Sequence, residues 1–172
     1  MSTLKVMCWN VENLFLPPPG DEPAAELFQR KLANLAAVID QQQPDVLALQ
    51  EIGPDGALQT LQGALSTSLP HASSGIADGR GIRVAFLCRY AIQRQQNIQP
   101  YPALIKAVQA RDPVFDDAET EEDESLSQAM GRGGLEISID VDGVEVTLLN
   151  AHFKSKLISY ARRSPDVPGS RF

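Results

Sequence analysis

The chain has 172 residues, of which 43% are hydrophobic, and carries a formal net charge of −7. This length predicts a single domain with a sizeable core. Nothing in the sequence looks like a signal peptide, and no run approaches the ~18 apolar residues of a membrane span. We therefore expect a soluble, cytoplasmic protein, in which Cys8 and Cys88 are buried free thiols within apolar runs.

The first half of the chain predicts two strands that alternate with two helices. Residues 4–9 form a strand-like run, and a proline-rich break follows it. A helix is predicted over 24–42, where apolar residues recur at helical spacing, and a shorter one over 56–65. Between them, residues 45–50 are apolar on both faces, as expected of a strand buried between layers.

The second half predicts strands separated by loops. The expected segments are a loop over 71–81, a strand over 82–89, a further strand within 98–108 and a loop from Ser159 onward. A hairpin is predicted from strands 134–140 and 144–150, because Asp142-Gly143 supplies a tight turn between them.

An acidic segment accounts for the net charge. Eight carboxylates lie between Asp112 and Glu124, with no lysine or arginine among them. Such a segment is too polar to form a core, so we expect residues 112–128 to be a mobile insertion. The other 14 acids face 15 bases, which leaves the body at a net +1. A phosphate-bearing substrate, nucleic acid included, is compatible with that balance.

Glu51 is the strongest candidate for a site residue. It follows a strand whose preceding residues are apolar or amide, so the sheet would hold its carboxylate at an open rim. Carboxylates suit Mg²⁺, which takes one or two from the protein and keeps water and phosphate oxygens as its other ligands. The plainer reading is an ordinary surface glutamate after a strand.

Two more polar residues stand near the ends of predicted strands. Asn10 follows the first strand, and its amide oxygen could bind the same metal if that strand neighbours the strand of Glu51. His152 follows the hairpin, where an imidazole can contact a phosphate or transfer a proton. The plainer readings are a turn asparagine and a structural histidine.

Two basic residues are candidates for substrate contact. Arg132 precedes a glycine pair, and a guanidinium suits bidentate phosphate binding. Lys154 lies just after His152 and would add positive potential. A solvated loop residue is the alternative for each.

Together these segments resemble the endonuclease/exonuclease/phosphatase superfamily, which includes deoxyribonuclease I, apurinic endonucleases, neutral sphingomyelinases and inositol-polyphosphate 5-phosphatases. The resemblance covers roughly residues 4–156 and rests on Trp9-Asn10 with Asn13-Leu14-Phe15, Gln50-Glu51, the strand around Val84–Leu87, and Asn150 with His152. It implies an α+β fold of the deoxyribonuclease I-like type, an αββα four-layer sandwich. It also implies that Glu51 is a metal ligand for Mg²⁺ (or Mn²⁺), Asn10 its partner and His152 an active-site histidine.

The family pattern also has later motifs that are missing here. The sequence holds no Gly-Asp-x-Asn segment and no Ser-Asp-His segment, which supplies the family's general base. The resemblance therefore implies that residues 1–172 are the N-terminal part of a single, incomplete domain. We expect a metal-dependent phosphoester hydrolase, a phosphodiesterase or nuclease, that is inactive without the C-terminal half.

Two other readings stay open. A half-domain would expose an apolar sheet face, so it would self-associate, bind its missing half or another partner, or aggregate, and would act as a binding or split-assembly module. The last reading is a plain α/β domain in which the motifs arose by chance.

Overall fold

The computed structural model describes residues 3–54, 56–101, 108–109, 126–127 and 129–153. For residues 108–109, 126–127 and 129–132 only the backbone is described. The predicted mobile insertion over 112–128 lies almost wholly outside the described residues, as does the predicted loop from Ser159. None of the described helices is long and apolar enough to cross a membrane.

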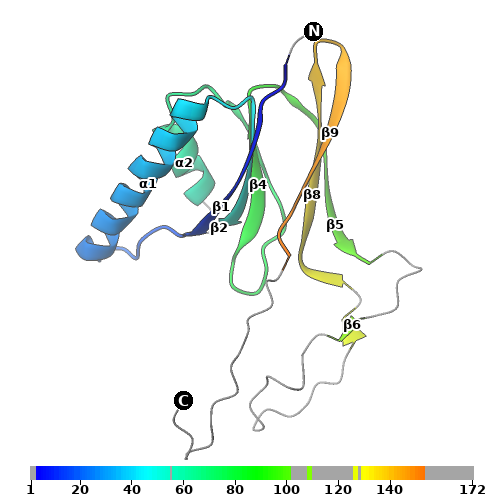
Figure 1. Cartoon of the computed structure of the whole chain (residues 1–172). Coiled ribbons are helices and arrows are strands. Elements are labelled where there is room, and N and C mark those ends of the chain that lie inside the picture. The colour runs from blue at the N-terminus through cyan, green and yellow to red at the C-terminus, as the bar shows by residue number, and fades with distance from the viewer. Residues whose placement is uncertain (1–2, 55, 102–107, 110–125, 128, 154–172) are drawn as a thin grey trace, which may run out of the picture.

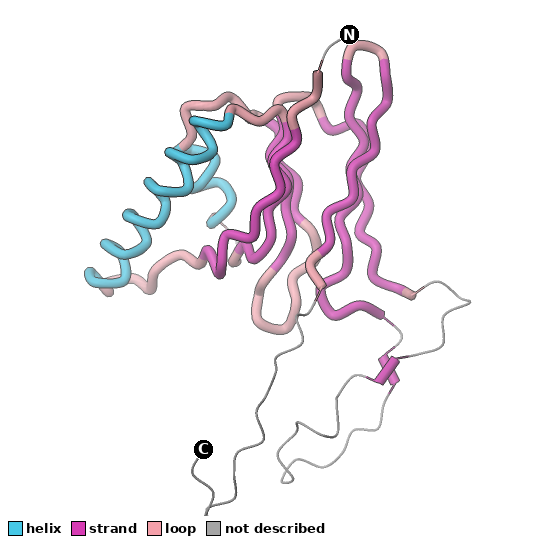
Figure 2. The backbone as a smooth tube through the Cα atoms, viewed as in Figure 1, coloured by secondary structure: helices cyan, strands magenta, loops and turns pink. Residues whose placement is uncertain are grey.

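Two sheets pack face to face, and two helices cover the outer face of the first sheet (Figures 1 and 2). The helices are α1 (Glu22–Gln42) and α2 (Ala57–Ala64). Sheet A has the strand order β1 (Val6–Leu14), β2 (Val46–Ile52), β4 (Arg83–Cys88), β3 (His71–Ser74). Sheet B has the order β5 (Ile92–Pro100), β8 (Ala129–Val141), β9 (Val144–Ala151). A short separate pair joins β6 (Val108–Gln109) to β7 (Leu126–Ser127). The described residues thus form helix, sheet and sheet layers of the predicted sandwich.

The sequence places the start of α1 by side-chain capping. Asp21 accepts a hydrogen bond from the Ala24 amide at 3.0 Å, and Pro23 stands in the first turn, where its missing N–H is not needed. Gln43 ends the helix in a left-handed conformation, with φ at 49°. The predicted helix is confirmed and begins two residues earlier than expected.

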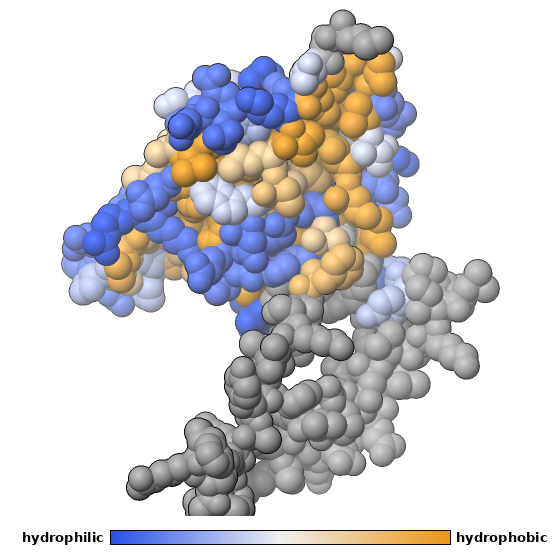
Figure 3. Space-filling view, in the orientation of Figure 1, coloured by the Kyte–Doolittle hydropathy of each residue, from blue (hydrophilic) through white to orange (hydrophobic). Residues whose placement is uncertain are grey.

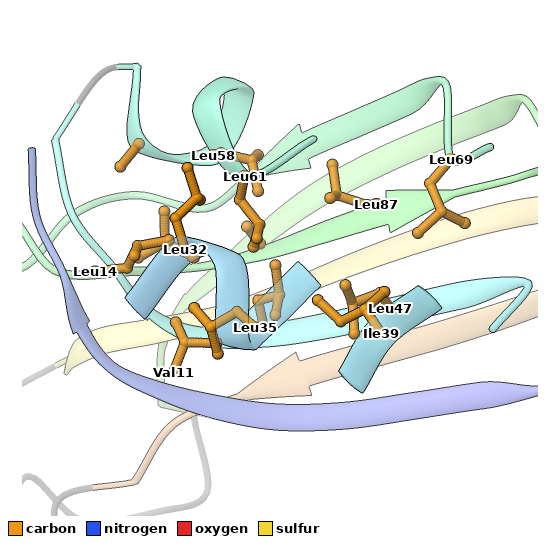
Figure 4. Packing of buried hydrophobic residues seen from close by; sticks show 14 of the residues in the cluster. Val11, Leu14, Leu32, Leu35, Ile39, Leu47, Leu58, Leu61, Leu69 and Leu87 are labelled. Atoms are coloured by element: carbon orange, nitrogen blue, oxygen red, sulfur yellow. The ribbon is translucent and has the colours of Figure 1, made fainter. Parts of the chain in front are cut away.

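The strand β2 separates two hydrophobic cores. Its side chains at 47 and 49 face the helices, whereas those at 46 and 48 face sheet B. Figure 4 shows the first core, in which Leu32, Leu35 and Ile39 of α1 meet residues of α2 and sheet A. Burial on both faces explains why this run is almost uniformly apolar. The strand predicted over 45–50 and the hairpin with its Asp142-Gly143 turn are confirmed.

Two polar strands were not placed by the prediction. The loop predicted over 71–81 is wrong at its start, which is the strand β3; this strand pairs with β4 and buries Ser73. Of the strand expected within 98–108, residues 98–100 are the end of β5, which begins at Ile92, and residues 102–107 lie outside the described residues. Both are edge strands, and β5 is mostly polar, so neither carries the apolar alternation that marks a half-buried strand.

The prediction of two buried thiols holds for Cys88 and fails for Cys8, which is exposed. Cys8 lies on β1, the outermost strand of sheet A, in register with Ala48. Sheet B packs against β2 and β4 through β8 and β9, and its outermost strand on this side is β9. The described part of sheet B therefore leaves the inner face of β1 uncovered at Cys8.

Candidate active site

The parallel strands β1 and β2 end at one rim. They run in register from Val6 with Val46 to Asn10 with Gln50, and the register then shifts before Leu14 pairs with Ile52. The ladder between β2 and β4 shifts at the same level, between Leu49 and Ile52. Both irregularities turn the backbone at this rim, as β-bulges near active sites often do.

Three non-glycine residues at this rim have left-handed backbones. Their φ angles are 54° at Glu12, 54° at Asn13 and 64° at Glu51. Such conformations cost of the order of 1–3 kcal/mol each and persist only where surrounding contacts hold them. Because Glu51 departs from strand geometry, its side chain leaves the alternation of β2 and reaches the rim.

Glu51 is held by both of its oxygens. Its Oε2 accepts a hydrogen bond from the Asn13 amide at 3.0 Å, and its Oε1 lies 3.6 Å from Nε2 of His152. The side chains of Glu51 and His152 are each 17% exposed. Glu51 comes from sheet A, whereas His152 follows the last strand of sheet B. The structure thus brings two of the predicted site residues together across the two sheets.

Asn150 fastens the two sheets to each other beside this pair. Its buried amide nitrogen donates to the carbonyl of Leu49 at 2.9 Å and to that of Ala85 at 3.0 Å. These carbonyls lie where the β2–β4 ladder becomes irregular, so the side chain from sheet B binds sheet A at this position. Oδ1 of Asn150 accepts from Nε2 of Gln50 at 2.7 Å. This network fixes the backbone next to Glu51 and two residues before His152.

No role was predicted for Gln50 and Asn150, which stand only within the motifs that carry the family resemblance. A usable signal was present, since each is polar at an inward position of a strand with apolar neighbours. A buried amide has to be hydrogen-bonded, so such positions point to a structural network. Its partners come from β2, β4 and β9, which no local pattern connects.

Asn10 lies at the same rim but is engaged locally. Its Oδ1 accepts a hydrogen bond from the Glu12 amide at 2.8 Å, which closes a short turn of the Asx kind. Its backbone pairs with Gln50, next to Glu51 in the chain. The expectation that the strand ends of Asn10 and Glu51 meet at one rim therefore holds for the backbone. The Asn10 side chain would have to turn away from Glu12 to reach a shared ligand.

The two basic candidates lie outside the described side chains. Arg132 belongs to β8, of which only the backbone is described there, and Lys154 is outside the described residues. The second histidine of the chain, His71, lies on β3, at the opposite edge of sheet A from β1.

The donor set fits a magnesium-type ion better than a zinc-type ion. The described residues contain no group of three or more histidine, cysteine, aspartate or glutamate side chains that could hold a metal. A single partly exposed rim carboxylate, with an amide oxygen on the same rim, is compatible with Mg²⁺, which keeps most of its water. Glu51 contacts the Asn13 amide through Oε2 and His152 through Oε1, and a carboxylate offers about four lone-pair sites, so these two contacts leave capacity for an ion.

The fold is a two-sheet α/β sandwich with helices on its outer face. Its candidate site is a polar rim, where a carboxylate and an imidazole meet at the ends of the strands. The family model for the Endonuclease/Exonuclease/phosphatase family matches residues 7–130, and the chain belongs to that family. No curated protein sequence matches the chain.

Solved structures show the same fold. A family protein from Leptotrichia buccalis C-1013-b is 20% identical, with a TM-score of 0.52, and the match covers 88% of this chain and 54% of that one. Sphingomyelinase C from Streptomyces griseocarneus is 18% identical, with a TM-score of 0.55 and coverages of 94% and 52%. A humanized TDP2 from D. rerio is 19% identical, with a TM-score of 0.55 and coverages of 88% and 51%. The chain therefore spans about half the length of each of these structures.

Proposed function

We propose that this chain binds a phosphodiester at a Mg²⁺ or Mn²⁺ site on the rim of sheet A and belongs to a metal-dependent phosphodiesterase or nuclease. The observation that carries the proposal is the meeting of Glu51 and His152 from different sheets, 3.6 Å apart and both partly open to solvent. A bare salt bridge would not need the strained backbone that turns Glu51 to the rim.

Each residue has a distinct part in this proposal. Glu51 would hold the ion, with the amide oxygen of Asn10 as a further ligand once it turns from Glu12. When bound, the ion would act as a Lewis acid that stabilises negative charge on the phosphate oxygens. His152 would donate a hydrogen bond to a phosphate oxygen, and its contact with Glu51 orients the imidazole. Arg132 and Lys154 remain candidates for further phosphate contact.

Hydrolysis by this chain alone is expected to be very slow. The sequence has two histidines, and His71 lies on β3, away from the rim that His152 shares with Glu51. If His152 binds phosphate, the chain brings no second imidazole to deprotonate the attacking water. General-base catalysis typically contributes about 10²- to 10⁴-fold, so its absence should lower the rate by that order.

The test begins with a titration of the metal-free protein with Mn²⁺, monitored by calorimetry and by Mn²⁺ electron paramagnetic resonance. Hydrolysis of bis(p-nitrophenyl) phosphate is then assayed in the presence of Mn²⁺. We expect a saturable Mn²⁺ site, competed by Mg²⁺, with turnover close to the metal-only background. Absence of saturable binding would refute the metal site. Strong Mn²⁺-dependent turnover would instead refute the expectation of a missing base.

A second candidate function is split assembly, and the uncovered inner face of β1 favours it. We call this face, with the exposed inward side chain of Val144 on β9, the open seam; its residues are Val6, Cys8 and Val144. Val6 is 46% exposed and Val144 is 62% exposed. Figure 3 shows hydrophobic surface on the side of the molecule where β1 and β9 lie. An uncovered apolar face beside an edge strand favours association with another polypeptide.

Cys8 offers a direct probe of the open seam. Cys8 is exposed, whereas burial raises the pKa of Cys88 to about 12 and keeps it from forming the reactive thiolate. If the seam joins two copies of the chain, alkylation of Cys8 should slow as protein concentration rises, in step with a shift to larger size in gel filtration. Cys88 should stay unmodified throughout.

A matched pair of variants controls this experiment. Val144→Lys should keep the chain monomeric and Cys8 reactive at every concentration, because it places a charge in the seam. Val38→Lys makes the same change at an exposed position on α1, 39% exposed, and should behave as the unaltered protein. Alkylation at one rate over the whole concentration range would count against self-association.

A further inference from the structure

We infer that Lys31 of α1 is a positioning residue for the Glu51 carboxylate, acting through the peptide group between Glu12 and Asn13. The inference rests on the proposed function and adds a residue to that site. Nζ of Lys31 donates a hydrogen bond to the carbonyl oxygen of Glu12. The amide N–H of Asn13 donates to Oε2 of Glu51 at 3.0 Å. That carbonyl and that N–H belong to one peptide group, so an ammonium and a carboxylate bind its two ends.

The charges match the dipole of this peptide group. The positive ammonium meets the negative carbonyl end, and the negative carboxylate meets the positive N–H end. Both hydrogen bonds are charge-assisted, and each polarises the peptide in the direction that strengthens the other. Lys31 and Glu51 are therefore coupled although they are on different elements, with the peptide between them.

The backbone at this point needs such support. Glu12 and Asn13 are consecutive residues in the left-handed region, and neither is a glycine. Rotation of the peptide between them changes φ of Asn13, so it would take Asn13 out of the left-handed region and would turn its N–H away from Glu51. Lys31 opposes this rotation because its bond to the carbonyl is lost when the peptide turns. Half-buried beside Phe28 and Leu32 on α1, it is held on a rigid element close to the rim.

Lys5 provides a matched control of the same chemistry. Nζ of Lys5 donates to the carbonyl of Gln42 at 2.8 Å, so it too ties α1 to β1 through a lysine and a main-chain oxygen. Gln42 ends α1, and Lys5 precedes β1, at the end of that strand opposite to Asn10 and Glu51. If Lys31 merely fastened the helix to the sheet, both lysines should matter alike.

The experiment compares Lys31→Met, Lys31→Arg and Lys5→Met. The first readout is amide hydrogen exchange at Asn13, measured by NMR on the metal-free protein. Loss of a charge-assisted bond predicts exchange about tenfold faster in Lys31→Met. Lys31→Arg should restore the original rate, since a guanidinium also donates to a carbonyl, and Lys5→Met should leave Asn13 unchanged. Asn13 exchange in Lys31→Met equal to that of the unaltered protein would overturn the inference.

The second readout is Mn²⁺ affinity. A carboxylate that loses its N–H partner becomes mobile, so Lys31→Met should weaken Mn²⁺ binding by about tenfold, while Lys5→Met leaves it unchanged. Equal affinity in Lys31→Met would overturn the link between Lys31 and the metal. If the unaltered protein itself bound no Mn²⁺, the proposed function would fail, and the exchange measurement would still decide whether Lys31 positions Glu51.

Discussion

Asn150→Leu is expected to lower the free energy of unfolding by about 3–5 kcal/mol, because it leaves buried hydrogen-bonding groups without partners. The amide nitrogen of Asn150 donates to the carbonyls of Leu49 and Ala85, and both carbonyls lose this donor in Asn150→Leu. Nε2 of Gln50 loses Oδ1 of Asn150 as an acceptor but keeps its contact with Sγ of Cys8 at 3.2 Å. Each such group costs about 1–3 kcal/mol when it is buried and unpaired. Denaturant unfolding followed by the fluorescence of Trp9, the only tryptophan, measures the change.

Two variants separate this network from packing. Asn150→Asp keeps the shape of the side chain but replaces the donor nitrogen by an oxygen that faces two carbonyls, so it should be at least as destabilising at neutral pH. Asn97→Leu removes an asparagine whose Oδ1 accepts one exposed bond, from the Ile76 amide at 3.1 Å, and should lose no more than about 1 kcal/mol. If Asn150→Leu unfolded within 1 kcal/mol of the unaltered protein, the amide would not be what fastens the sheets together.

Local patterns predict the elements whose burial is uniform. The strand β2 is apolar on both faces, and the hairpin carries its turn in Asp142-Gly143, so both could be placed from the sequence. The edge strands β3 and β5 could not, because most of their residues are polar. The exposure of Cys8 depends on how far sheet B extends over sheet A. The sequence of β1 alone does not show whether another sheet covers it.

The candidate site divides in the same way. Glu51 and His152 could be chosen from the sequence as residues that follow strands, and the family resemblance assigned their roles. Their approach across the sheets depends on Asn150, whose partners are about a hundred residues away along the chain. Glu12 and Asn13 have left-handed backbones although neither is a glycine, so the sequence gives no sign of this turn. The hydrogen bond from Lys31 to the Glu12 carbonyl depends on the turn and could not be predicted.

Glu51→Gln is expected to weaken Mn²⁺ binding by about a hundredfold or more, the largest effect predicted for any change at the rim. Glutamine has the same shape and can still accept the Asn13 N–H through its carbonyl oxygen, so the fold should be kept. What it loses is the charge that offsets the desolvation of the ion. Isothermal titration of the metal-free protein gives the affinity, and unfolding in denaturant checks the fold.

Glu12→Gln is the matched control, because it removes the same charge from an exposed position on the same rim. An effect of general negative potential would be shared by the two carboxylates, but it is screened by salt over a distance of about 8–10 Å. Glu12→Gln should therefore change Mn²⁺ affinity by only a few-fold, and less at high salt. Equal weakening in the two variants would mean that the rim attracts cations without Glu51 binding one. A selective loss in Glu51→Gln would identify the strained carboxylate as the ligand, and the cost of holding its backbone would then be explained by metal binding.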